Sequence, residues 1–405
     1  MTTDTSSSGE ILTKLDNYVQ LGSSGLEVSP LCLGTMTFGQ QDKADDQIKT
    51  SKIVFDKYYE LGGNFFDTAN FGNGDSERIL GQYLTSKRSK VVISSKYMTP
   101  PSAQKSSDPN SGVLNRKSLV ENLDASLKRM GIGYVDVLYT QISDYGTNVE
   151  NVLRGLDDTV RSGKALYIAI TDTPAWIISE ANAISRLRGW SQFVALSSQY
   201  SLTDRSFEFD LRPMCMKNGI GVIPYNVISS GFLTGRYTEE YLKSDQDFPA
   251  KNTVLKYANK KNWGILEEVK DISEEVGRSP AEVAINWTLQ QPGITSLVVA
   301  ARNEGILDEN LKALEFKLTP QQLLRLNTTS SSTEIPFPHS SQPNPIYIAS
   351  QPTPEYLHAL EQFKPYSVQS GEPSSSKSRK RAQSDPEGTE TPVEESQSLY
   401  KKNRQ

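Results

Sequence analysis

Short runs of apolar and β-branched residues alternate along the chain with longer segments in which apolar residues repeat at a helical spacing. The short runs are typical of buried strands, and the longer segments are typical of helices with one apolar face. Eight strands are predicted, at residues 31–34, 64–67, 91–96, 135–141, 165–171, 194–197, 221–225 and 296–300. Nine helices are predicted, at residues 46–61, 76–84, 117–130, 148–162, 174–188, 207–217, 262–276, 279–291 and 304–313.

Strands that alternate with helices indicate βα units and a mainly parallel sheet. Eight units predict an α/β fold of the (β/α)8 TIM barrel type, with a doubly wound open sheet as the alternative arrangement. Residues 18–21 and 26–28 flank a turn, which predicts an N-terminal β-hairpin that plugs the bottom of the barrel. The segment between Tyr225 and Asn262 is too long for a simple connection, so we expect it to cover a cofactor or a substrate.

The composition divides the chain into four regions. We expect residues 1–17 to form a flexible N-terminus and residues 18–327 to form the barrel. Residues 328–366 are rich in Ser, Thr and Pro but keep enough apolar residues to pack on the barrel as an extension. Residues 367–405 have too few apolar residues to pack, which predicts a largely disordered polar tail. The tail contains a basic cluster at 377–381. This cluster is a motif for nuclear import, a motif that binds an acidic partner, or only a run of charges exposed to solvent.

Composition also narrows the classes of function. The formal net charge of −5 leaves no excess of positive charge for binding phosphates, so no nucleic-acid partner is expected. Both histidines, His339 and His358, follow the barrel region, so no histidine-dependent metal site or triad is expected within it. The polar N-terminus lacks the apolar region of a secretory signal, and no apolar run is long enough to span a membrane. With two distant cysteines, Cys32 and Cys215, these features predict a cytoplasmic protein, and they leave its oligomeric state open.

The active site of a TIM barrel lies at the C-terminal ends of its strands. The last polar residue of each predicted strand is therefore a candidate for function. These candidates are Asp67, Lys96, Gln141, Thr171 with Asp172, Ser197, Tyr225 and Arg302.

The sequence around these candidates carries a series of short motifs. They are GTM at 34–36, GGNFFDTAN at 62–70, SK at 95–96, YVDVLY at 134–139, TDTPAW at 171–176 and SSGFLTG at 229–235. In this order and spacing they resemble the aldo-keto reductases, over roughly residues 18 to 327. They are most similar to the fungal branch that contains aryl-alcohol dehydrogenases and norsolorinic-acid reductases.

The resemblance implies that a hydride moves between NADP and a carbonyl or alcohol, beside a cluster of Asp, Tyr, Lys and His at the barrel mouth. Asp67 and Lys96 match the Asp and the Lys of that cluster. Phe71 stands where the Tyr is expected, and Gln141 stands where the His is expected. Phe has no proton to donate, whereas an amide can orient a carbonyl oxygen but cannot transfer a proton.

Two tyrosines are alternative proton donors, Tyr97 and Tyr139. Tyr97 directly follows Lys96, so it points to the opposite face of the sheet if the strand continues. Without the Tyr of the family, Asp67 and Lys96 have a second interpretation as a buried ion pair that only ties two strands together.

The resemblance also implies an NADP site. Tyr225 corresponds to the residue that stacks on the nicotinamide ring, and Thr171, Asp172 and Ser197 hold the positions that bind its carboxamide. Asp172 departs from the commoner Asn, and Ser197 from an expected Gln. The other residues assigned to the cofactor are Gly34, Thr35, Asn226, Ser229, Ser230 and Gly231, with Arg302 and Asn303 at the 2′-phosphate and Glu309 and Asn310 at the adenine. The alternative for Arg302 and Glu309 is a surface ion pair of little energetic consequence.

The leading hypothesis from the sequence is an NADP-dependent oxidoreductase that acts on an aromatic or polyketide-like carbonyl or alcohol in a fungal secondary pathway. One alternative, motivated by Phe71 and Gln141, is a catalytically silent barrel that binds nucleotide and serves as a regulatory or partner protein. Another is a dehydratase or cyclase that uses Lys96 and Asp67 without redox chemistry.

Overall fold

A computed structural model of the chain describes residues 14–39, 44–70, 74–97, 114–142, 146, 148–243, 251–332 and 339. The chain divides into two units, Met1–Tyr366 and Ser367–Gln405. All described residues belong to the first unit. The predicted tail, most of the predicted extension and residues 1–13 therefore lie outside the described residues.

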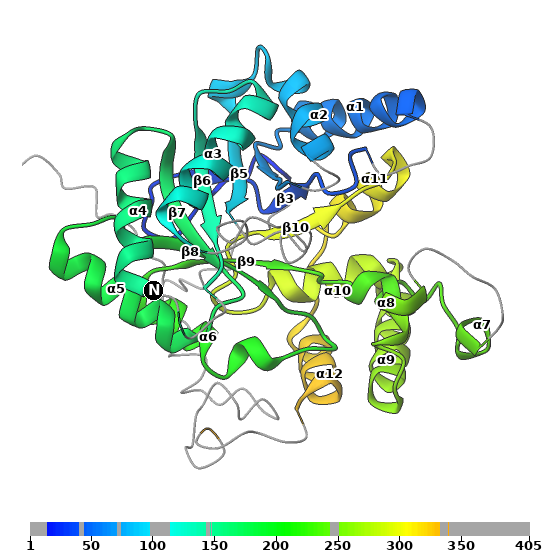
Figure 1. The fold of residues 1–405 in the computed structure, drawn as a ribbon. Helices are drawn as coiled ribbons and strands as arrows, with labels where there is room; N and C mark the ends of the chain where they lie inside the picture. The colour runs from blue at the N-terminus through cyan, green and yellow to red at the C-terminus, as the bar shows by residue number, and fades with distance from the viewer. Residues whose placement is uncertain are drawn as a thin grey trace, which may run out of the picture. The chain divides into compact units, whose positions relative to one another are not determined.

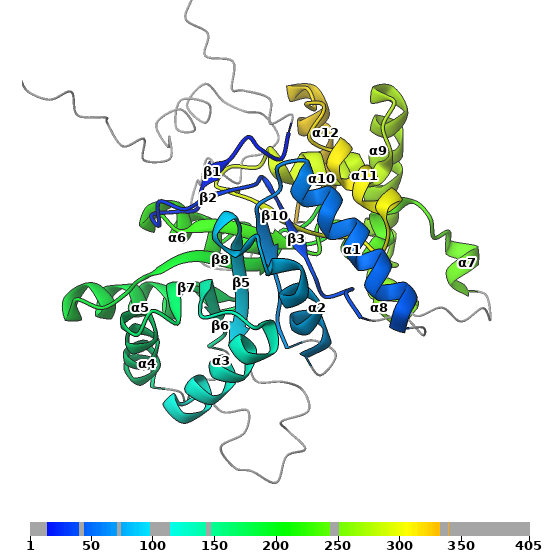
Figure 2. The same ribbon diagram turned by 90° about the horizontal axis from the view of Figure 1, so that it is seen from above.

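Eight parallel strands form a barrel in the order β10-β3-β4-β5-β6-β7-β8-β9 (Figures 1 and 2). Their bounds are Leu31–Gly34 (β3), Phe65–Asp67 (β4), Val92–Tyr97 (β5), Val135–Thr140 (β6), Ala165–Thr171 (β7), Phe193–Gln199 (β8), Gly221–Tyr225 (β9) and Leu297–Ala300 (β10). A parallel bridge between Val222 and Ile294, with a 2.8 Å hydrogen bond from Thr295 N to Val222 O, brings β9 next to β10 and closes the ring. The predicted barrel is confirmed, because a doubly wound sheet has two open edges and a reversal in its strand order.

Helices follow the strands and lie around the outside of the ring (Figure 2). The longer ones are Ala44–Glu60 (α1), Asp75–Leu84 (α2), Arg116–Met130 (α3), Val149–Arg161 (α4), Ala175–Arg188 (α5), Leu211–Asn218 (α6), Lys260–Val276 (α9), Pro280–Leu289 (α10), Glu304–Lys312 (α11) and Pro320–Ser330 (α12). In the described part of the chain, no helix is long and apolar enough to cross a membrane.

The predicted helix at residues 207–217 is wrong in its first part. The structure has a 3-10 turn, Ser206–Glu208 (η4), and then a separate helix, α6. Pro213 explains the break, because its ring would clash with the carbonyl of Phe209 in a continuous helix. The helix can begin only where Pro213 falls in its first turn.

Helix α12 was not predicted from the sequence. It begins at a capping box, in which Thr319 Oγ1 accepts from Gln322 N at 3.3 Å and the Gln322 side chain accepts from Thr319 N at 3.0 Å. The helix extends past residue 327, the expected end of the barrel region.

The long segment after β9 is a succession of short helical pieces. They are Ser229–Thr234 (η5), Glu239–Lys243 (α7) and Lys251–Leu255 (α8), and residues 244–250 lie outside the described part. A second 3-10 turn, Arg88–Lys90 (η2), precedes β5.

An N-terminal hairpin plugs the barrel as predicted. Its strands, Val19–Gln20 (β1) and Glu27–Val28 (β2), are antiparallel. Leu21 and Val28 are fully buried in the cluster that fills the barrel interior, together with Cys32, Phe65 and Tyr139. The turn of the hairpin approaches the N-terminal ends of β8 and β9 so closely that a Cβ atom on Gly22 would lie 2.2 Å from Val194 O. The hairpin thus closes the bottom of the barrel.

Candidate functional site

The centre of the barrel mouth is an ion pair between two neighbouring strands. Asp67 ends β4, and Lys96 lies one residue before the end of β5. Lys96 Nζ contacts Asp67 Oδ2, and Ser94 Oγ donates to Asp67 Oδ1 at 2.7 Å. The two side chains are 12% and 13% exposed, so the pair is shielded from most solvent and still reachable from the mouth. Asp67 thereby fixes the position of the Lys96 ammonium.

Tyr139 lies under this pair, inside the barrel. Tyr139 is the register partner of Lys96 on β6, and Lys96 Nζ lies 5.6 Å from the centre of its ring. The side chain is 1% exposed, and burial raises its pKa well above the usual value, with further contributions from Asp67 and Cys32. Tyr139 therefore faces the correct side of the sheet for a proton donor, but its proton is held tightly beneath the mouth.

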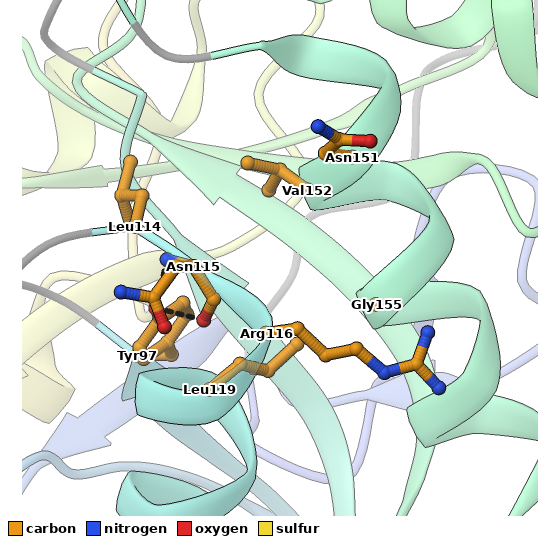
Figure 3. A pocket seen from close by; sticks show the side chains of 8 residues that line it. All are labelled: Tyr97, Leu114, Asn115, Arg116, Leu119, Asn151, Val152 and Gly155. Atoms are coloured by element: carbon orange, nitrogen blue, oxygen red, sulfur yellow. Dashed lines mark hydrogen bonds between the residues drawn. The ribbon is translucent and has the colours of Figure 1, made fainter. Parts of the chain in front are cut away.

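Tyr97 points away from the mouth, as strand alternation predicts. Its hydroxyl donates to Asn115 O at 3.1 Å, at the start of α3, and lies 3.2 Å from Ser118 Oγ. Figure 3 shows this side chain beside Leu119 of α3 and Val152 of α4, at a small cavity on the outside of the sheet. Tyr97 is therefore not placed to protonate a substrate at the mouth.

Gln141 follows the last residue of β6 and is half-buried. The segment is fixed by a 3.0 Å hydrogen bond from Ile142 N to Thr173 Oγ1. Among the described residues, no hydrogen bond involves the amide of Gln141, so it can bind a carbonyl oxygen or a water molecule. Phe71, at the position where the resemblance implies a tyrosine, lies outside the described residues.

Asp172 and Tyr225 form a second polar pair at the mouth. Tyr225 Oη lies 3.0 Å from each carboxylate oxygen of Asp172, and Thr171 Oγ1 donates to Asp172 Oδ2 at 3.2 Å. Burial raises the pKa of Asp172, and the Tyr225 and Thr171 hydroxyls and the charge of Lys96 oppose this rise. Burial also raises the pKa of Tyr225, so the phenol keeps its proton and donates it to the carboxylate.

Backbone strain is concentrated at the residues expected to bind the cofactor. In the described chain, four residues other than glycine have a positive φ: Asp172 at 42°, Asn226 at 59°, Ser229 at 52° and Ser230 at 56°. All four belong to the set proposed from the sequence. Such residues each cost about 1 to 3 kcal/mol and persist mainly at ligand sites and active sites.

The strained loop after β9 is held by its own side chains and by the segment that follows β8. Ser230 N donates to Asn226 Oδ1 at 2.6 Å. Ser229 is fully buried, and its hydroxyl lies 2.6 Å from Thr203 Oγ1. Ser229 is thus an anchor of the loop. Ser230 and Gly231 are partly exposed, and their N–H groups donate within the loop, to Asn226 Oδ1 and to Ile228 O.

Other predicted cofactor residues lie deeper. Gly34 is within β3, and Thr35 is fully buried, with Oγ1 3.1 Å from Asp67 O. Ser197 is buried, and its carbonyl accepts from Asp172 N at 3.2 Å. These residues support the mouth from below rather than line it.

At the far end of the predicted cofactor site, Arg302 is exposed and precedes α11. Asn303 caps this helix, and its Oδ1 accepts from Ile306 N at 3.0 Å. Asn310 is buried and donates to Ala300 O at 3.1 Å. Among the described residues, no ion pair joins Arg302 and Glu309.

Sequence reasoning missed Tyr257, which joins the covering segment to the strained loop. Asn226 Nδ2 donates to Tyr257 Oη at 2.6 Å, and Gln199 Nε2, at the end of β8, lies 3.4 Å from the same oxygen. A tyrosine in a segment expected to cover a ligand was the available signal. The described His, Cys, Asp and Glu side chains form no group of three or more that could hold a metal ion.

Comparison with known proteins gives four results that bear on this site. The model of the aldo/keto reductase family matches residues 30–330. The chain is 32% identical to norsolorinic acid reductase B of Dothistroma septosporum, over 83% of this chain and 87% of that protein. It is 32% identical to aryl-alcohol dehydrogenase [NADP(+)] of Phanerodontia chrysosporium, over 78% and 86%, and 33% identical to a probable voltage-gated potassium channel subunit beta of Arabidopsis thaliana, over 75% and 93%.

Proposed function

Because this chain belongs to the aldo/keto reductase family, a family of oxidoreductases that use nicotinamide cofactors, we propose that it is an NADP-dependent enzyme acting on an aromatic or polyketide-like carbonyl or alcohol. The names of two relatives, a norsolorinic acid reductase and an aryl-alcohol dehydrogenase [NADP(+)], support this substrate class and cofactor. Fungal secondary metabolism is the setting that the first name favours.

The strained loop after β9 is the observation that carries this proposal. Ser229, Ser230 and Gly231 all have a positive φ, and hydrogen bonds from their N–H groups to Asn226 and Ile228 hold the loop in this conformation. A surface loop that served only as a connection would have no reason to retain this strain. The loop, Tyr225 and Arg302 thus fit a nicotinamide dinucleotide along the rim of the barrel.

We assign the chemistry of the mouth to Asp67, Lys96 and Gln141. A bound nicotinamide cofactor supplies or accepts the hydride. Lys96, held by Asp67, places a positive charge where a carbonyl oxygen becomes an alkoxide. The amide of Gln141 orients that oxygen, and a water molecule held between Lys96 and Gln141 gives the proton. Direct donation from Tyr139 has no support, because its hydroxyl is buried.

A catalytically silent nucleotide-binding barrel with a regulatory role is the second candidate. The similarity to a protein named as a potassium channel beta subunit favours it, and so do Phe71 and Gln141 at the positions of the family's Tyr and His. One assay distinguishes the enzyme from the silent barrel. Purified protein is incubated with NADPH and 4-nitrobenzaldehyde, and oxidation of NADPH above the protein-free rate supports the enzyme, whereas saturable NADPH binding without turnover supports the silent barrel.

We expect NADPH to bind more tightly than NADH because Arg302 offers an unpaired cation for the 2′-phosphate. Arg302→Leu should weaken NADPH binding roughly 10-fold or more, as expected for loss of a charged hydrogen bond, and leave NADH unchanged. Fluorescence titration with both nucleotides measures the effect. Arg186→Leu, at an exposed arginine in the last turn of α5, is the control. Equal affinity of the wild type for NADPH and NADH contradicts this role of Arg302.

We expect Tyr257→Phe to weaken NADPH binding roughly 2- to 10-fold, because the loop loses the hydrogen bond from Asn226 but keeps the aromatic ring. Titration of NADPH measures the change, and a faster dissociation rate should accompany it. Tyr18→Phe is the matched control, since Tyr18 Oη donates only to Gly62 O, at the hairpin end of the barrel. An unchanged dissociation constant in Tyr257→Phe would show that the covering segment does not hold the loop.

A further inference from the structure

The barrel mouth contains two carboxylates, although one is sufficient to form an ion pair with Lys96. Asp67 already forms the ion pair with Lys96, and Asp172 lies at the same mouth, close enough for the charge of Lys96 to affect its pKa. The described mouth residues Asp67, Lys96 and Asp172 together carry a net negative charge. An asparagine at this position would leave the mouth neutral.

Hydrogen bonds stabilise the ionised form of Asp172 and oppose the rise of its pKa that burial causes. Three oxygen contacts at 3.0 to 3.2 Å come from the Tyr225 and Thr171 hydroxyls, and both hydroxyls can donate to a carboxylate. Asp172 is partly buried but still accessible at the mouth, and its backbone is strained, with φ at 42°. A strained backbone and converging donors indicate that the position of this charge is specified.

The position of the charge relative to Tyr225 gives it a function. Both carboxylate oxygens contact the Tyr225 hydroxyl, so any ring that stacks on the phenol of Tyr225 lies beside a negative charge. Reduction of a carbonyl takes a hydride from a neutral dihydronicotinamide and a proton from water. The products are an alcohol, a hydroxide ion and a ring with one positive charge. A neighbouring carboxylate attracts the charged ring and has little effect on the neutral one.

We propose that Asp172 stabilises the oxidised, positively charged nicotinamide ring relative to the reduced ring, and so favours carbonyl reduction over alcohol oxidation at this site. The inference rests on the proposed function, because it requires the nicotinamide to stack on Tyr225. It assigns to Asp172 an electrostatic role that Asn cannot perform, since a carboxamide has similar hydrogen-bonding atoms but no charge.

The test compares the affinities of NADP+ and NADPH in the wild type and in Asp172→Asn, by equilibrium titration at pH 8. We expect the dissociation constant of NADP+ to rise about tenfold in the variant and that of NADPH to change less than about twofold, since opposite charges a few Å apart at a protein surface contribute about this much. Asp158→Asn is the matched control. It removes one negative charge on α4, where Asp158 pairs with Arg116 and Arg154, and should alter neither affinity.

A second variant, Tyr225→Phe, keeps the aromatic ring and removes the hydroxyl that holds the carboxylate. It should also weaken the binding of NADP+ more than that of NADPH, by a smaller factor than Asp172→Asn does. This variant provides the test if Asp172→Asn does not fold. An unchanged ratio of the two affinities in both variants, or an equal loss for both nucleotides, overturns the role of Asp172 and leaves the NADP site in place. Failure of the wild type to bind either nucleotide overturns the proposed function itself.

Discussion

We expect Lys96→Met to lower kcat/KM for an aromatic aldehyde by about 10²- to 10⁴-fold, because a positioned acid or charge typically contributes this much to catalysis. The ammonium lies between Asp67 and the mouth, and no other described cation occupies the centre of the mouth. Its loss removes both the charge that stabilises the alkoxide and the group that holds the proton-donating water. Methionine preserves most of the length of the side chain, so the effect on packing is small. The measurement is NADPH oxidation with 4-nitrobenzaldehyde at saturating NADPH.

Two further variants separate catalysis from general damage. Lys128→Met makes the same substitution in the last turn of α3, at an exposed position, and should have no effect on the rate. Phe71→Tyr restores the residue type that the family pattern expects and should raise the rate in the presence of Lys96. If the wild type already reduces aldehydes rapidly and Lys96→Met does not lower the rate, the catalytic centre lies elsewhere.

Gly22→Ala lowers the free energy of unfolding by roughly 2 to 5 kcal/mol, the largest stability effect we expect in the described structure. A left-handed φ of +52° is unfavourable for alanine by about 1 to 2 kcal/mol. The added methyl group would also lie 2.2 Å from Val194 O and 2.6 Å from Gly221 N, and these backbone atoms belong to the barrel wall. Overpacking of this kind typically adds about 1 to 3 kcal/mol. Urea denaturation at unchanged m value measures the loss.

Gly25→Ala is the matched control for the plug. It lies in the same turn, also has a left-handed φ of +74°, and its added Cβ meets no atom within 4 Å. It should lose only the conformational contribution of about 1 to 2 kcal/mol. Equal losses at the two glycines would mean that the hairpin does not press against β8 and β9.

Most of the barrel could be predicted because its strands and helices have distinct periods along the sequence. The failures were local. At Pro213 the apolar pattern of a helix continues, but the backbone cannot remain helical. Helix α12 follows its cap residue, Thr319, where a short polar capping box precedes a weakly apolar helix. Tyr97 and Tyr139 were separable in principle, because strand alternation alone assigns them to opposite faces.

The site was only partly visible in the sequence. Asp67 and Lys96 could be found because strand ends converge at a barrel mouth. The strain at Asp172, Ser229 and Ser230 could not be predicted, since none of these residue types requires a positive φ. The contact of Tyr257 with Asn226 spans 31 positions and depends on the course of an irregular segment, so no periodic pattern reports it.

Closure of the ring between β10 and β3 has a consequence for the synthesis of the chain. Ser296 Oγ donates to Ser29 O across 267 positions, and the neighbouring residues Leu297 and Leu31 are register partners. At about 5 to 20 residues per second, the ribosome needs on the order of 15 to 50 s to synthesise the chain from Ser29 to Ser296. Throughout that interval β3 has no partner on one side, and an unpaired apolar strand can associate with other chains. The nascent chain therefore has a period of vulnerability to aggregation that ends only when the last barrel strand leaves the ribosome.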